Sequence, residues 1–172
     1  VRYFDTVFLL YAMNELGYKK IINISLKISE KTLSINDLED NNNIIIVYPY
    51  NSFNKEIFDK FKYKYVGYSN SIERNNIDNS YKKVFINNVS YIDKDDYKYL
   101  DYLFMIKEGK VLGEYELNTH INEYLLSYDE VLKVSNKEDI LNTKEIIDMC
   151  NLTIGYKEGL LPVYDENINS FE

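Results

Sequence analysis

The residues best suited to chemistry follow an apolar run at residues 44–47, within a stretch at 43–53 that reads NIIIVYPYNSF. Hydroxyl and amide groups come directly after this run, on Tyr48, Tyr50, Asn51, Ser52 and Asn54. Such groups can hold a small anion or a sugar beside the N-terminus of a following helix. These five residues are therefore the candidates for a ligand-binding corner. The interpretation that we favour is that the same side chains only cap the helix and shape the turn.

Other chemical groups are isolated in the sequence. His120 is the single histidine and Cys150 the single cysteine, so a His-rich zinc site and an internal disulfide are both excluded. Asp101 with Glu114 and Glu116 resembles the metal-binding hairpin of restriction-type nucleases, but Glu116 stands where that motif has a lysine. Cys150 is predicted to be a buried structural thiol. We expect no catalytic residue, no metal and no cofactor.

Charge and composition limit the partners that the chain can have. The net charge is −8, from 20 basic and 28 acidic residues, and no run of lysine or arginine forms a phosphate-binding stripe. We therefore expect a protein partner, and neither nucleic acid nor a membrane. The single cysteine favours a reducing, cytoplasmic setting. The sequence leaves open the oligomeric state and whether the chain is part of a longer protein.

Apolar patterning predicts the elements that position the corner. Residues 44–47 form an unalternating, β-branched run, which is typical of a strand covered on both faces. Pro49 ends this strand, and a helix follows that Asn51 or Ser52 would cap, with Glu56 in its first turn. Residues 65–68 predict the next strand. This strand, loop, helix and strand order indicates an α/β fold.

The rest of the chain predicts further elements around this centre. Residues 102–106 and 111–117 flank Gly109, and this pattern predicts an antiparallel hairpin. The other predicted elements are a helix at 2–16, strands at 21–28 and 84–86, a helix from 121 to 132, and a helix from about 136 to 150.

Three stretches carry a resemblance to a known family: ISLKISEKTLSINDL, NNNIIIVYPYNSF and YLFMIKEGKVLGEYEL. Together, residues 23–126 resemble the thioredoxin-like superfamily, in its peroxiredoxin and thioredoxin-like lipoprotein branches. The resemblance implies a mixed central sheet of about five strands flanked by helices. From chain length and patterning we expect a single domain over 1–172, with an N-terminal helix at 1–20, a thioredoxin-like core at 21–134, and a helical extension and tail at 135–172.

The chain departs from that family at both redox positions. Residues 49–56 contain no cysteine, and residues 100–102 contain no proline before the predicted hairpin. Disulfide exchange needs a low-pKa cysteine at the helix start, so we expect a redox-inactive, non-catalytic module for protein–protein interaction or assembly. One alternative function is an α/β domain that binds a small polar ligand such as a nucleotide sugar as part of an enzyme. The alternative fold is Rossmann-like, although residues 49–54 lack the glycines that a dinucleotide needs. A viral or particle structural protein is the other alternative function.

Overall fold

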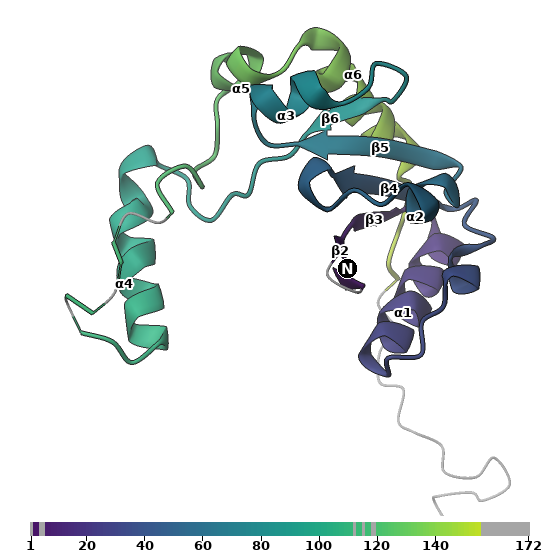
Figure 1. Ribbon diagram of the computed structural model, residues 1–172, viewed down its shortest axis with the longest axis horizontal. Helices are drawn as coiled ribbons and strands as arrows, with labels where there is room; N and C mark the ends of the chain where they lie inside the picture. The colour runs from purple at the N-terminus through teal and green to yellow at the C-terminus, as the bar shows by residue number, and fades with distance from the viewer. Residues whose placement is uncertain (1, 4–5, 112, 115, 118–119, 156–172) are drawn as a thin grey trace, which may run out of the picture.

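The computed structural model describes residues 2–3, 6–111, 113–114, 116–117 and 120–155, which form a mixed sheet flanked by helices (Figure 1). This arrangement confirms the predicted α/β class. The strands of the sheet, in the order in which they pair, are β3 (Leu9–Ala12), β4 (Ile44–Pro49), β5 (Tyr63–Tyr68) and β6 (Lys83–Phe85). β3 is antiparallel to β4, and the other pairs are parallel. A separate antiparallel pair joins β1 (Arg2–Tyr3) to β2 (Thr6–Val7).

Helices connect and cover these strands. The α-helices are α1 (Glu15–Ser29), α2 (Lys55–Asp59), α3 (Ser71–Asn76), α4 (Tyr97–Lys107), α5 (Tyr128–Val134) and α6 (Lys137–Met149). Three short 3₁₀ helices are η1 (Ile35–Leu38), η2 (Tyr50–Ser52) and η3 (Lys94–Asp96). No helix in the described part of the chain is both long and apolar enough to cross a membrane.

The central strand β4 is covered on both faces, as its unalternating sequence predicts. Ile44 and Ile46 belong to a core that includes Phe58 of α2 and residues of α1. Ile45 and Val47 belong to a second core, which α6 closes from the other side. All four β4 side chains are at most 2% exposed. Burial on both faces explains why every position of the run is apolar.

The N-terminal part of the chain differs from the prediction. The predicted helix at 2–16 and the predicted strand at 21–28 are both wrong. Of the helix predicted at 1–20, residues 15–20 are helical as part of α1, and residues 1, 4 and 5 lie outside the described residues. β3 pairs with the central strand instead, and α1 begins after Asn14, whose Oδ1 accepts a hydrogen bond from the Gly17 amide at 3.1 Å. Gly17 is required there, because a Cβ atom would lie 2.0 Å from the carbonyl oxygen of Asn43.

The predicted hairpin around Gly109 is also wrong. Its first strand is part of the helix α4, and Gly109 ends that helix in a left-handed conformation with φ of +65°. The Lys110 amide then donates to the Met105 carbonyl at 3.0 Å. One of the stretches that resembles the thioredoxin-like superfamily thus has another structure, and membership of that superfamily stays a prediction.

The C-terminal helices follow the prediction more closely. The helix expected from residue 121 begins later, at α5, where the Ser127 hydroxyl and the Glu130 side chain form a capping box. A second helix was predicted to end near Cys150, and α6 confirms it. Its N-cap is Asn136, whose side chain accepts from the amide of Asp139. The Asn136 side chain is a favoured N-cap group.

A part of the chain stands away from the sheet, and we call the described residues from 91 to 124 the arm. It contains η3, α4 and a segment that returns beside α4 (Figure 1). At its base, Tyr91 and Tyr124 form an isolated parallel β-bridge, and their rings stack at 6.5 Å. The Asn87 side chain donates to the Tyr124 carbonyl at 3.0 Å. These contacts close the arm on itself where it meets the remainder of the fold, which we call the body.

Candidate functional site

The five residues of the predicted ligand corner do not line one common pocket. Tyr48 was expected at the mouth of this corner, but its side chain is fully buried in the core. Its ring packs against Phe8 at 5.7 Å and against Phe53 at 5.6 Å. The cause is the alternation of β4, which turns Tyr48 toward the same face as Ile46.

Tyr50 and Asn54 line different pockets. Tyr50 lines a pocket of about 210 Å³ with Phe53 and Tyr81. Asn54 lines another, of about 460 Å³, which extends toward the loop before η1. Asn54 is also the N-cap of α2, since its Oδ1 accepts from the amide of Glu56 at 3.0 Å. The helix is therefore capped by Asn54, and the predicted caps Asn51 and Ser52 have other roles.

Asn51 and Ser52 connect neighbouring loops. The Asn51 side-chain amide donates to Glu73 Oε1 at 2.7 Å, which links the end of β4 to α3. The Ser52 hydroxyl donates to the carbonyl of Val7 at 2.7 Å, which links the same turn to β2. These bonds fit the favoured interpretation, in which the polar groups shape the turn. Binding of a small ligand at this corner stays a prediction.

A buried polar cluster that the sequence did not reveal joins three elements. The hydroxyl of Tyr68 on β5 donates to Asp139 Oδ2 at 2.7 Å, and Arg74 Nε on α3 donates to the same oxygen at 2.6 Å. Asp139 is 3% exposed. Burial, and then the hydrogen bond to Asp139, raise the pKa of Tyr68 above its usual range, so its hydroxyl stays protonated. The only sequence signal was the capping spacing of Asn136 and Asp139.

The pocket beside this cluster is rich in cations, but they are engaged within the protein. Its volume is about 230 Å³, and Arg74, Lys82 and Lys83 line it. Lys83 Nζ donates to the Ile77 carbonyl at 2.8 Å and to Asn79 Oδ1 at 2.9 Å. Lys82 pairs with a carboxylate of α6. These groups hold α3 and α6 to the sheet, which is a structural role.

The single histidine takes part in packing within the arm. His120 stacks on Phe104 of α4 with ring centroids 4.7 Å apart, and its Nδ1 lies 2.7 Å from Glu123 Oε1. The nuclease-like set is divided, because Asp101 is buried on α4 while Glu114 and Glu116 belong to the return segment. Among the described residues, no three His, Cys, Asp or Glu side chains are grouped so that they could hold a metal ion.

Cys150 lies at the end of α6 and is half-buried rather than fully buried. It lines an apolar pocket of about 440 Å³ with Tyr11, Val47 and Ile86. Burial raises the pKa of its thiol, so the thiolate that disulfide chemistry needs is disfavoured.

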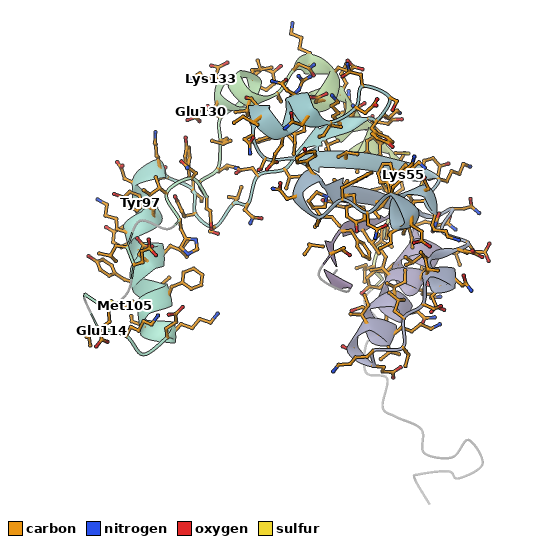
Figure 2. The ribbon with its side chains drawn as sticks, in the orientation of Figure 1. Lys55, Tyr97, Met105, Glu114, Glu130 and Lys133 are labelled. Atoms are coloured by element: carbon orange, nitrogen blue, oxygen red, sulfur yellow. The ribbon has the colours of Figure 1, made fainter. Side chains whose placement is uncertain are left out.

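An exposed apolar surface lies on the outer side of α4. We call Tyr99, Tyr102, Leu103 and Ile106 the α4 stripe. Leu103 is 62% exposed and Ile106 is 71% exposed, whereas the charged Asp101 of the same helix is 2% exposed. Figure 2 labels Tyr97 near one end of the helix and Met105 near the other, with Glu114 on the return segment. The sequence did not predict this face because residues 102–106 were expected to form a strand.

Comparison with known proteins gives one kind of relative. No family model matches the chain. The chain is 27% and 26% identical, over 159 residues, to the DNA polymerase III subunit alpha of two strains of Staphylococcus epidermidis. The match covers 89% of this chain, and the chain spans about 15% of the length of these relatives.

Proposed function

We propose that the chain is a non-catalytic module of a protein that is similar to DNA polymerase III subunit alpha, in which it serves assembly through protein–protein contacts. The observation that carries this proposal is the extent of the match, which covers 89% of the chain but only 15% of each relative. A similarity that runs through nearly all of one chain, and through a small part of the other, supports a module within a larger protein.

Charge and surface support contacts with protein rather than with DNA. The net charge of −8 opposes the phosphate neutralisation on which binding to nucleic acid depends. The α4 stripe instead offers a run of exposed apolar side chains, which is typical of a surface that another protein covers. DNA synthesis is the activity named for the relatives, and we assign it to the parts of such a protein that lie outside this module.

A replacement experiment tests this proposal. The matched 159-residue stretch of the Staphylococcus epidermidis subunit would be exchanged for this chain to give a chimera, and in a control it would be exchanged for a flexible linker. We expect the chimera to synthesise DNA and the linker variant to lose most of that activity, while the isolated chain synthesises none. A chimera as inactive as the linker variant would contradict the proposal. Equal, full activity in both would contradict an assembly role.

A further inference from the structure

We propose that the α4 stripe docks into an apolar groove, rimmed by carboxylates, in the remaining part of a DNA polymerase III alpha-like protein. This inference rests on the proposed function and names the surface through which the module would assemble.

The spacing of the stripe matches a helical docking face. Tyr99, Tyr102, Leu103 and Ile106 follow the i, i+3, i+4, i+7 pattern, which places them in one row along α4. An amphipathic helix binds a groove through such a row. Within this row, Tyr99 is 64% exposed and Ile106 is 71% exposed. If the described residues covered this row, these exposed fractions would be close to zero.

The helix α4 carries apolar side chains on both of its sides. On the outer side, Leu103 and Ile106 face solvent. On the inner side, Asp101 is fully buried, and the apolar residues beside it are half-buried, namely Tyr97, Leu100, Phe104 and Met105. The return segment contacts the opposite side of the helix, where Phe104 stacks on His120. Figure 1 shows no strand of the sheet beside α4. The stripe is therefore the side of α4 that the described residues leave exposed.

The charges beside the stripe indicate the chemistry of the partner. The exposed charged residues of α4 are Lys98 and Lys107, one near each end of the helix. Asp95 and Glu108 lie just outside it, and Glu108 is paired with Lys110. Each of the two lysines of α4 lies one helical turn from a stripe residue, since Lys98 precedes Tyr102 by four positions and Lys107 follows Leu103 by four. A groove that accepts this helix should therefore be apolar at its centre and carry Asp or Glu at its rim.

The same lysines argue against a second copy of this chain as the occupant. In an antiparallel pair of α4 helices, Lys98 of one copy would face Lys107 of the other, and in a parallel pair each lysine would face itself. The helix has 11 residues, so it is only about 16 Å long. Two such stripes would bury far less than the roughly 1,200 Å² that a stable interface needs.

The relatives supply an occupant of sufficient size. A contiguous match that covers 89% of the chain must include α4, which lies in the middle of the sequence. Most of each relative lies outside the match, so the protein that contains this module would have ample surface to cover the stripe.

Cysteine labelling tests whether the stripe is covered. Leu103→Cys and, as control, Leu26→Cys on α1 would be made with Cys150→Ser, in the isolated chain and in the chimera. Leu26 is 55% exposed and so is a matched apolar helix position. Maleimide labelling of each site would be followed by mass spectrometry of its peptide. We expect position 103 to react on the order of tenfold more slowly in the chimera, and position 26 to react equally in both.

Equal labelling of position 103 in an active chimera would overturn the docking inference and leave the proposed function standing. An inactive chimera would overturn both. If labelling slowed equally at positions 103 and 26 in the chimera, the α4 stripe would not be the specific docking surface, and the inference would be overturned.

A charge-insertion variant adds an independent readout. Leu103→Glu with Ile106→Glu should reduce DNA synthesis by the chimera about tenfold or more, while Ile22→Glu with Leu26→Glu on α1 should change it less than about twofold. Both pairs should leave the urea midpoint of the isolated chain nearly unchanged, because all four side chains are exposed. If the isolated chain sediments as a dimer that the α4 pair dissociates, the face belongs to a second copy and the inference is overturned.

Discussion

The central strand β4 and the helix α4 carry apolar runs of similar length but opposite burial. The side chains of residues 44–47 are at most 2% exposed, whereas Leu103 and Ile106 of α4 are 62% and 71% exposed. Composition therefore does not decide which run becomes core. The difference lies in the neighbours: α1, α2 and α6 cover β4 within this chain, while the return segment covers only one side of α4.

The difference in burial between β4 and α4 should have its largest effect on the free energy of unfolding. Ile46→Ala removes a fully buried side chain between two covering layers, so we expect the free energy of unfolding to fall by about 4 kcal/mol. Ile106→Ala on α4 should change it by less than about 0.5 kcal/mol, because that side chain is already solvated. Urea unfolding of the two variants measures both values. Similar losses in the two variants would mean that the arm packs as tightly as the body.

A second contrast lies within α6, between a buried and an exposed ion pair. Asp139→Ala leaves Arg74 and Tyr68 without their shared carboxylate in a buried site, and we expect a loss of about 3 kcal/mol. Glu145→Ala breaks the exposed pair with Lys82 and should cost less than about 1 kcal/mol. Urea midpoints of the two variants give the comparison. A larger loss at Glu145 would show that the buried cluster does not join the elements as described.

Helix caps extend the comparison to smaller effects. Asn54→Ala removes the N-cap of α2, whose Ile57 and Phe58 are buried, so global stability should fall by about 1 kcal/mol. Asn54→Ser should retain most of that stability. Ser127→Ala removes the cap of α5, which has no buried residue, and should lower only the local protection of that helix. Chemical unfolding and amide hydrogen exchange separate the global effect from the local one.

Two carboxylates in capping positions give the smallest effect, and it depends on pH. Bonds from Lys27 and then Ser34 lower the pKa of Asp37 in the body to about 2. Bonds from Ser127 lower the pKa of Glu130 on α5 to about 2. A lowered pKa in the folded state means that each bond stabilises fully above the ordinary carboxyl pKa and is lost as the pH falls through about 2. NMR titration of the two carboxyl groups should give both values.

The same titration compares the two regions. Below the ordinary carboxyl range, α5 should lose helicity before η1, because Leu38 anchors η1 in the core and α5 has no buried residue. Loss of η1 before α5 would contradict this order.

The elements that were predicted correctly are those whose apolar pattern in the sequence matches their burial in the fold. Residues 44–47 indicate a two-sided strand, and β4 is one; the helix that ends near Cys150 is α6. The α/β class follows from these elements. At residues 21–28, an apparent alternation favoured a strand, but the buried and half-buried positions Gly17, Ile21, Ile24 and Ile28 follow a helical period. Asn14 as an N-cap was the signal for α1 that could have been used.

The parts that could not be predicted depend on contacts between distant segments. Residues 2–16 fit a helical spacing, yet β3 forms because it completes the edge beside β4. Gly109 suits a hairpin turn as well as a helix end, and only the fold distinguishes them. In the predicted corner, Tyr48 is in the core. Asn51 and Ser52 form hydrogen bonds with segments that are distant in the sequence, at Glu73 and Val7.

Amide hydrogen exchange of α4 relative to β4, in the isolated chain and in the chimera, tests the central claim most directly. In the isolated chain, α4 should exchange far faster than β4, because one of its faces is uncovered. In the chimera, docking of the α4 stripe should slow exchange in α4 by about tenfold or more and leave β4 unchanged. If the difference in exchange rate between α4 and β4 were the same in an active chimera as in the isolated chain, the claim that α4 is the docking surface would be contradicted.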